Sequence, residues 1–361
     1  MNKISFLKVF DELVGRPSVM ALSRIWHDKK RIIETFGKIL LIRPGGIGDA
    51  VLLLPAIREL KKTLAGAEID ILAEKRNADI FRLSEIAGRI YLYDRGIDLF
   101  RCLKNKYNVV IDTEQWHRLS AVVASLTKAP VRIGFDTNER QKLFTHRVPY
   151  SHDDYEVVSF FHLLEPLGVN PDRGCGDPPF IDIRGEGFSP PSALGREDRI
   201  VAIFPGASVR ERKWGGDRFG VVAKVLNDMG YRVVLLGSST DKADADLIKK
   251  RAPDTTDLAG KTDLRQVATV LGMSSLLISA DSGLLHIAYA VGTPTVSLFG
   301  AGIEKKWAPC GDRHIVLNKH LDCSPCTRFG YTPKCRRNVE CLALIHVDEV
   351  IEAARRTLDA S

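Results

Sequence analysis

The chain has 361 residues, of which 45% are hydrophobic and 27% are charged, and it carries a formal net charge of +7. These values are typical of a soluble globular protein and exclude a fibrous repeat or a disordered chain. The longest apolar runs, such as AVLLLPAI at 50–57, are much shorter than the roughly 18 residues that a membrane-spanning helix needs. The length suits two domains better than one.

The positive charge gathers at the amino-terminal end. Residues 1–43 contain nine Lys or Arg against four Asp or Glu, and aromatic residues are interleaved with them. Such a basic, aromatic segment either lies on an anionic membrane surface or packs as a pair of helices on the first domain, and we favour packing. No cleavage pattern of small residues follows an apolar core, so we expect no secretory signal and a cytoplasmic protein.

From Lys38 the chain alternates strands and helices. KILLIR at 38–43 predicts a buried strand, the glycine turn PGGIGD follows, and AVLLLPAIRELKKTL at 50–64 predicts an amphipathic helix. AEIDILAE at 67–74 and YNVVID at 107–112 predict further strands. Short apolar strands that alternate with helices indicate an α/β fold with a parallel sheet covered on both faces.

Residues 170–198 are rich in Pro, Gly and charge and have no sustained period, as expected for a linker. The alternation starts again at Arg199, so the second half is also α/β. We therefore expect four parts: a basic amphipathic extension at 1–37, a Rossmann-like domain at 38–185, a second Rossmann-like domain at 186–345, and a carboxyl-terminal helix at 346–361.

The stretch ADSGLLHIAYAVGTPTVSLFG at 280–300 places Asp281 at a strand end and Ser282 and Gly283 at the start of the next helix. His286 follows one turn later on the same helix face as Ser282. The helix dipole and unpaired N–H groups favour an anion at such a turn, where Gly283 lets a phosphate approach the backbone. The alternative is structural: Asp281 or Ser282 caps the helix and His286 belongs to the core.

Two more strand ends in the second half carry polar groups. FPGASVRERKW at 204–214 offers the Ser208 hydroxyl and several cations, among which Lys213 is a compact point charge suited to a diphosphate. LLGSSTDK at 235–242 carries Asp241, which either accepts hydrogen bonds from a ribose or caps the next helix. We expect these groups to converge on one nucleotide diphosphate, although the first stretch alone also fits a solvated basic loop.

The turn RPGGIGD at 43–49 has neither the G-x-G-x-x-G order of a dinucleotide site nor the G-K-[ST] ending of a P-loop. A nicotinamide enzyme or an ATPase is therefore disfavoured. The turn carries one acid, Asp49, which suits a general base for an acceptor hydroxyl opposite a nucleotide diphosphate. Its alternative role is to cap the helix that it precedes.

Four of the seven cysteines, Cys323, Cys326, Cys335 and Cys341, form a C-x2-C-x8-C-x5-C run. In a reducing compartment this spacing indicates metal before disulfide, and four thiolates would hold one structural zinc ion. A thiol-rich loop without metal, or a disulfide formed on oxidation, is the competing interpretation. We expect Cys102 and Cys175 to be buried thiols.

Three stretches, in this order along the chain, resemble the signature blocks of glycosyltransferase family 9, the bacterial heptosyltransferases that build the lipopolysaccharide core. They are ILLIRPGGIGDAVLLLPAIREL at 39–60, FPGASVRERKW at 204–214 and ADSGLLHIAYAVGTPTVSLFG at 280–300. The C-x2-C run also occurs in many members. The resemblance extends from Lys38 to the carboxyl terminus, and the ordered set is more specific than any one block.

The resemblance implies a GT-B fold, in which two Rossmann-like domains face each other across a cleft. It implies an inverting transfer of a sugar, heptose from ADP-heptose, without a catalytic metal or other cofactor. Asp49 matches the proposed base and Lys213 the lysine on the donor phosphates. The other implied donor-binding residues are Gly45, Gly46, Ser208, Asp241, Asp281, Ser282, Gly283 and His286.

The implied partners are a nucleotide-diphosphate sugar and a lipid-linked oligosaccharide acceptor, with no nucleic acid. Together with the basic extension at 1–37, they suggest peripheral contact with the cytoplasmic face of the inner membrane. Acceptor contacts are expected from the first domain, where four arginines are candidates and otherwise ordinary surface residues: Arg76, Arg118, Arg132 and Arg140.

The sequence departs from the family at Gly215, where many members have Pro, and in residues 1–37, which precede the usual start. The main alternative function is a non-catalytic GT-B scaffold that binds a nucleotide sugar or glycan without turnover. Retention of Asp49, Lys213 and His286 together argues against it. A Rossmann oxidoreductase is disfavoured by the missing dinucleotide fingerprint.

Overall fold

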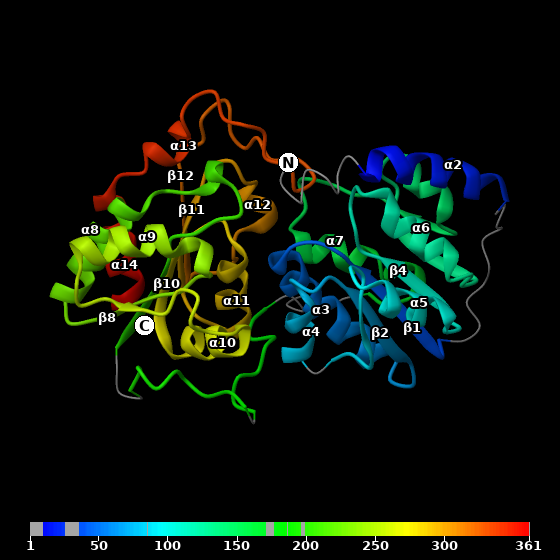
Figure 1. Ribbon diagram of the computed structural model, residues 1–361, viewed down its shortest axis with the longest axis horizontal. Helices are drawn as coiled ribbons and strands as arrows, with labels where there is room; N and C mark the ends of the chain where they lie inside the picture. Colours follow the sequence, from blue (N-terminus) through cyan, green and yellow to red (C-terminus); the bar gives the residue numbers. More distant parts are fainter. Residues whose placement is uncertain are drawn as a thin grey trace. The chain divides into compact units, whose positions relative to one another are not determined.

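The computed structural model describes residues 10–25, 36–84, 86–170, 177–185, 187–195 and 199–360. The chain divides into two compact units, unit 1 (Met1–Asp177) and unit 2 (Pro178–Ser361). Each unit contains a six-stranded sheet with helices on both faces (Figure 1). The boundary between the units lies inside the stretch 170–198 that the sequence marks as a linker.

The sheet of unit 1 is parallel throughout, in the order β3-β2-β1-β4-β5-β6. Its strands are β1 (Lys38–Arg43), β2 (Glu68–Ala73), β3 (Ile90–Leu92), β4 (Val109–Asp112), β5 (Val131–Phe135) and β6 (His146–Val148). Its helices and short helical turns are η1 (Asp11–Gly15), α2 (Arg16–Ile25), α3 (Ile47–Thr63), α4 (Ala78–Leu83), α5 (Gly96–Lys104), α6 (Arg118–Leu126), η2 (Glu139–Leu143), α7 (Glu156–His162) and η3 (Glu165–Leu167).

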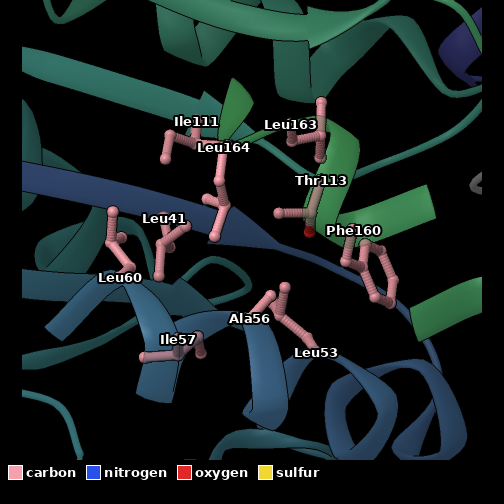
Figure 2. A pocket seen from close by; sticks show the side chains of 10 residues that line it. All are labelled: Leu41, Leu53, Ala56, Ile57, Leu60, Ile111, Thr113, Phe160, Leu163 and Leu164. Carbon is pink, nitrogen blue, oxygen red and sulfur yellow. The ribbon is translucent and has the colours of Figure 1, made fainter. Parts of the chain in front are cut away.

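Alternate side chains of β1 enter two different core layers, because successive residues of a strand point to opposite faces. Leu40 and Ile42 pack with residues of α2, α5 and α6. Leu41 faces the other layer, where it meets α3 and the segment around α7 (Figure 2). The hollow in Figure 2 is lined by nine apolar side chains and by Thr113, whose hydroxyl donates to the Ile42 carbonyl at 2.9 Å. The hollow is therefore a gap between packed side chains inside the core of unit 1.

The sheet of unit 2 is also parallel and has the order β12-β11-β10-β7-β8-β9. Its strands are β7 (Ile200–Phe204), β8 (Arg232–Leu235), β9 (Thr256–Asp257), β10 (Ser274–Ala280), β11 (Thr295–Phe299) and β12 (His314–Asn318). Its helices and turns are η4 (Arg210–Arg212), α8 (Gly216–Asp228), η5 (Ser239–Asp241), α9 (Lys242–Arg251), α10 (Leu264–Met273), α11 (Gly283–Val291), α12 (Glu304–Trp307), α13 (Glu340–Ala343) and α14 (Val347–Asp359).

Helices α8, α9 and α14 cover one face of this sheet, and α10, α11 and α12 lie on the other side (Figure 1). The first face buries a continuous cluster that includes Ile203 of β7, Phe219 of α8 and Ala354 of α14. The carboxyl-terminal helix is therefore part of the core of unit 2. The backbone N–H groups of Phe180 and Ile181 both donate to the Ala290 carbonyl, which ties the start of unit 2 to α11.

The two sheets share one topology, and this topology positions the polar groups. Strands β1, β2 and β3 follow one another from the centre of the sheet to one edge. The chain then returns to the centre, and β4, β5 and β6 follow one another to the opposite edge. Strands β7 to β12 repeat the pattern. The order therefore reverses between β1 and β4 and between β7 and β10, and in such sheets ligands bind beyond the carboxyl ends of the strands at the reversal.

The amino-terminal segment η1–α2 packs on unit 1, against α6 and η2 (Figure 1). Asp11 is 3% exposed, and its Oδ1 accepts the backbone N–H groups of Arg118 and Leu119 at 2.8 and 2.9 Å. These are the first N–H groups of α6, so Asp11 caps this helix from a distant part of the chain. Residues 1–9 and 26–35, which include Phe6 and Trp26, lie outside the described residues, so the expected pair of helices is described only over 10–25. No helix within the described ranges is long and apolar enough to span a membrane.

Candidate active site

Unit 1 gathers charged side chains where β1 and β4 end side by side. Arg43 is the last residue of β1, Glu114 lies just beyond β4, and Asp49 lies in the first turn of α3. The Arg43 Nη2 atom lies 3.6 Å from Asp49 Oδ2 and 3.4 Å from Glu114 Oε2. One buried cation therefore faces two carboxylates at the reversal point of the sheet.

Two backbone carbonyls fix the Arg43 guanidinium. Its Nε donates to Pro44 O and its Nη1 to Thr113 O, both at 2.8 Å. The side chain is 1% exposed, and the Phe160 ring lies 5.9 Å from its central carbon. Gly45 has φ of 109°, and a Cβ there would lie 3.1 Å from Nη2. Glycine at position 45 therefore has two effects. It can adopt the positive φ of this turn, and it leaves room for the Arg43 side chain.

The two carboxylates near Arg43 differ in access to solvent. The side chain of Glu114 is 7% exposed and that of Asp49 is 28% exposed. Burial raises the pKa of Glu114, but the charges of His117, Arg43 and Arg140 and a backbone N–H bond outweigh it and lower the pKa to about 2. Glu114 is therefore a buried anion, and Asp49 is the acid that a bound molecule can reach.

Further buried pairs surround this cluster. Arg140 Nη2 donates to Asp112 Oδ2 at 2.5 Å, with both side chains fully buried. Glu156, also fully buried, accepts hydrogen bonds from Gln115 Nε2 at 2.5 Å and from the Tyr150 hydroxyl at 3.2 Å. Burial raises the pKa of Asp112, and Arg140 opposes that shift. These pairs support the strand ends, although Nη1 of Arg140 is buried without a hydrogen-bond partner.

The four arginines considered for acceptor binding have different environments. Arg76 is a surface residue paired with Glu74, with its side chain 48% exposed. Arg118, Arg132 and Arg140 are only 5, 2 and 0% exposed, so the expectation of ordinary surface arginines is wrong for these three. Each is bonded within unit 1; Arg132, for example, donates to the carbonyls of Leu143 and Ala129. Contacts within unit 1 hold these three side chains, and the sequence pattern did not indicate that they are buried.

In unit 2 an ion pair joins the two strand ends at the reversal point. Arg212, from the loop after β7, places Nη1 3.1 Å from Oδ2 of Asp281, the residue directly after β10. Asp281 is 6% exposed. A Cβ on Gly302 would lie 2.1 Å from the same carboxylate oxygen, so only glycine fits there. The pair brings the basic loop 205–213 against the turn that begins α11.

That turn contains the acid, hydroxyl, glycine and histidine noted in the sequence. The Ser282 hydroxyl accepts the N–H of Leu285 at 3.3 Å and shares a hydrogen bond with Ser279 at 2.9 Å, so Ser282 is the N-cap of α11. Gly283 is the first residue of the helix, and His286 is 5% exposed. The capping role of Ser282 is seen directly, and the helix dipole still favours an anion at this turn.

The lysine and serine of the basic loop lie nearer to solvent. Lys213 Nζ pairs with Asp244 Oδ2 at 2.8 Å, and the lysine side chain is 32% exposed. Asp244 lies in the first turn of α9. Ser208 is exposed. A phosphate that binds Lys213 would therefore compete with the half-buried carboxylate of Asp244 for this cation.

Asp241 takes part in a capping box at η5. Its Oδ2 accepts the Ser238 N–H at 2.9 Å and the Ser238 hydroxyl at 2.8 Å. The residue is 7% exposed, and a Cβ on Gly206 would lie 2.3 Å from its Oδ1. Asp241 stands at the N-cap position of α9, but its side chain makes no capping hydrogen bond to that helix and instead closes the capping box of η5, while contact with a ribose stays a prediction.

The four clustered cysteines are free thiols on the segment between β12 and α14. Burial raises the pKa of Cys326 and of Cys341, and neighbouring cysteines raise both further. The Cys335 Sγ accepts backbone N–H groups of Arg337 at 3.4 Å and Val339 at 3.3 Å. Among the described residues no three His, Cys, Asp or Glu side chains are arranged as a metal site. Cys102 is buried as expected, and Cys175 lies outside the described residues.

Sequence reasoning assigned no role to Arg43 or Glu114, and it counted Arg212 only among the cations of the basic loop, without its pairing to Asp281. A weak signal exists for the first two, because each is a charged residue at the end of a short apolar strand. Which of these residues pair depends on which strands are neighbours, and only the strand order of the two sheets shows this.

Comparison with known proteins agrees with this geometry. Residues 97–335 match the model of glycosyltransferase family 9 (heptosyltransferase). Lipopolysaccharide heptosyltransferase 3 of Escherichia coli is 31% identical over 294 residues, which cover 74% of this chain and 85% of that protein.

Solved structures of low sequence identity share the fold. The ADP-heptose lipopolysaccharide heptosyltransferase II of E. coli superimposes with a TM-score of 0.70 at 22% identity, over 90% of this chain and 99% of that one. The E. coli heptosyltransferase WaaC, solved with ADP-2-deoxy-2-fluoro heptose, gives a TM-score of 0.69 at 17% identity, over 88% of this chain and 99% of that one. The fold is GT-B, as the sequence predicted. The chain is a glycosyltransferase and belongs to glycosyltransferase family 9, the heptosyltransferases.

Proposed function

We propose that the protein transfers heptose from ADP-heptose to a lipopolysaccharide-core or related lipid-linked acceptor, with inversion and without a catalytic metal. The observation that carries the proposal is the pair of polar clusters at the reversal points of the two sheets. Unit 1 offers an accessible carboxylate, Asp49, next to the buried Arg43 cation. Unit 2 offers Arg212 beside Asp281 at the start of α11, and Lys213 in the same basic loop, paired with Asp244 of α9. Relatives named as heptosyltransferases and a WaaC structure with an ADP-heptose analogue support the donor.

In this mechanism unit 2 stabilises the leaving group. When the bond from the anomeric carbon to the phosphate oxygen breaks, its electron pair stays on the ADP diphosphate. Lys213 and the N-terminal turn of α11 at Ser282 and Gly283 meet this growing negative charge. Removal of one such donor typically lowers the rate by about 10² to 10³. Ser208 adds a hydroxyl beside the phosphates, and Asp241 lies near the ribose.

Asp49 acts as the base. It takes the proton of the acceptor hydroxyl while the hydroxyl oxygen forms a bond to the anomeric carbon, on the side opposite to the departing diphosphate, and this inverts the centre. Because Asp49 Oδ2 faces the fixed Arg43 guanidinium, the second carboxylate oxygen is left for the acceptor. Arg43 is thus a positioning residue, whose two carbonyl contacts define where the carboxylate lies.

The test separates binding from turnover. In calorimetry with ADP and ADP-heptose, Lys213→Ala should weaken binding, whereas Asp49→Asn should bind the donor normally and lose about 10² to 10⁴ in kcat. Lys224→Ala is the matched control, since Lys224 also pairs with an aspartate of unit 2, Asp228, at the carboxyl-terminal end of α8. ADP-heptose binding without turnover in the unmodified protein would favour the non-catalytic scaffold, and no binding of ADP would contradict the donor assignment.

Two further features belong to the proposal. Cys323, Cys326, Cys335 and Cys341 are the candidate ligands of one structural zinc ion with no role in the transfer step, although no three of them are arranged as a metal site among the described residues. Thiols with raised pKa must lose their protons to bind a metal, so zinc binding should weaken at low pH. The protein would act at the cytoplasmic face of the inner membrane, where residues 1–37 provide a membrane contact.

A further inference from the structure

Unit 2 has a cavity of about 230 Å³ whose walls come from two distant stretches of the chain. The turn η4 contributes Arg210 and Glu211, and the turn at 334–339, within the cysteine run, contributes the rest. Pockets that enclose a whole drug-sized ligand measure about 300 to 1,000 Å³. This cavity is smaller, so it suits a single chemical group rather than a nucleotide sugar.

Cations dominate the lining of this cavity. Among the described residues that form it, three are cations and one is an acid: Arg210, Lys334, Arg336 and Glu211. The acid is bonded to the backbone, because Glu211 Oε1 accepts the N–H of Cys335 at 3.3 Å. The lining therefore carries a net positive charge at neutral pH, with two cations in excess.

The three cations have no carboxylate partner within the described ranges. The next two cations of the basic loop 205–213 do have one: Arg212 pairs with Asp281, and Lys213 pairs with Asp244. Like charges that face one space disfavour each other, and an anion between them reverses that effect. The cavity therefore has the charge that a bound anion would balance.

The turn that carries two of the cations is held in an unusual conformation. Asn338 and Val339 have φ of 48 and 59°, a region that a β-branched residue such as Val339 rarely adopts. Cys335 Sγ accepts the backbone N–H groups of Arg337 and Val339. Arg210 Nη2 donates to Asn338 Oδ1 at 3.3 Å, which ties the turn to η4. Backbone conformations of this kind gather at binding sites, where the surrounding contacts maintain them.

We propose that this cavity is an anion site that binds one phosphate group. A phosphate monoester carries about −1.5 to −2 charges at neutral pH, which matches the excess of cations. The guanidinium groups of Arg210 and Arg336 offer forked donors that fit phosphate oxygens, and Lys334 adds a point charge. The inference goes beyond the proposed function, because it adds to unit 2 a second anion site, made of residues that are not assigned to the donor diphosphate.

The test is a titration of the full chain with inorganic phosphate, in the presence of saturating ADP to occupy the proposed donor site. The NMR shifts of the Arg210 and Arg336 Nε–H groups report on the cavity, and the shift of Arg337, which does not line it, is the internal control. Arg336→Gln should bind phosphate about tenfold more weakly, since it loses a charged hydrogen-bond donor. Arg337→Gln removes the same charge from the same turn and should bind like the unmodified protein.

Two results would overturn the inference. One is equal phosphate affinity in Arg336→Gln and Arg337→Gln. The other is a set of phosphate-induced shifts no larger at Arg210 and Arg336 than at Arg337. A parallel titration with mannose 6-phosphate identifies the source of the phosphate group. Tighter binding than that of inorganic phosphate assigns the site to a phosphate-bearing sugar, and equal or weaker binding assigns it to the free ion.

Calorimetry with ADP on the same variants keeps the two proposals apart. Arg336→Gln should bind ADP like the unmodified protein. Loss of ADP affinity in this variant would make the cavity part of the donor site and would also overturn the inference. Absence of ADP binding to the unmodified protein would contradict the donor assignment, while the phosphate titration would still decide whether the cavity binds an anion.

Discussion

Glu114 provides a quantitative test of the charge cluster in unit 1. Its pKa is lowered from 4.5 to about 2, although burial acts in the opposite direction, because nearby cations and a backbone N–H bond favour the charged form. A carboxyl with a depressed pKa in the folded state contributes stability above its unfolded pKa and loses it as the pH falls toward its folded pKa. The window is therefore pH 4.5 down to about 2. At about 1.4 kcal/mol per unit, the contribution amounts to about 3 kcal/mol.

The perturbation is Glu114→Gln, which keeps the shape of the side chain and removes its titration. We expect the free energy of unfolding of the unmodified protein to fall by about 3 kcal/mol more than that of the variant between neutral pH and pH 2. Other carboxyls titrate in both proteins and cancel in the comparison. Glu165→Gln is the control, since the side chain of Glu165 is 54% exposed, and it should follow the unmodified protein.

Urea denaturation at a series of pH values measures this difference. Hydrogen exchange on peptides from β4 and α6 assigns it to unit 1, because two units need not unfold together. Parallel pH profiles for the unmodified protein and Glu114→Gln would refute the reasoning. They would mean that the Arg43 cluster does not hold an ionised glutamate in the interior.

Other predictions concern unit 2, the amino-terminal cap and the cysteines. Arg212→Ala leaves the buried Asp281 carboxylate unpaired and should cost about 3 to 5 kcal/mol in urea denaturation, with partial recovery in Arg212→Lys; a neutral effect would contradict the ion pair. Gly302→Ala should destabilise by about 1 to 3 kcal/mol and weaken ADP binding in calorimetry, because its Cβ would displace Asp281; unchanged binding would separate Asp281 from the donor. Asp11→Ala should cost about 1 kcal/mol and speed amide exchange at the start of α6, and unaltered exchange there would argue against the cap. Elemental analysis decides between the two interpretations of the cysteine run: about one zinc per chain would support the zinc site, and its absence would rule the site out.

The sequence was most informative about strands and the turns that follow them. KILLIR coincides with β1, and the ends of β7, β8 and β10 carry the basic loop, Asp241 and Asp281 as expected. Buried strands of a parallel sheet are short and apolar, and they end at glycine, proline or charged residues, which one sequence displays directly. Strands β3, β5, β6, β9 and β12 were not predicted. Three of them, β3, β6 and β9, have only two or three residues, which carry little periodic signal.

The buried charge networks could not be predicted in this way. Arg43 and Thr113 are distant in the chain and meet only because β1 and β4 are neighbours in the sheet. Burial of Arg132 and Arg140 likewise depends on tertiary contacts, and composition alone assigns an arginine to the surface. Local pattern indicates where a strand ends, but strand order determines which ends share a site.

The cap that Asp11 places on α6 has a consequence for folding during translation. A helix normally takes its cap from the residue just before it, so cap and helix leave the ribosome together. Here the capping carboxylate is made long before Arg118 and Leu119, whose N–H groups it accepts. Because domains tend to fold from the amino-terminal side during translation, the early segment must wait for its partner. Until α6 emerges, the Asp11 carboxylate has no helix to cap on the nascent chain.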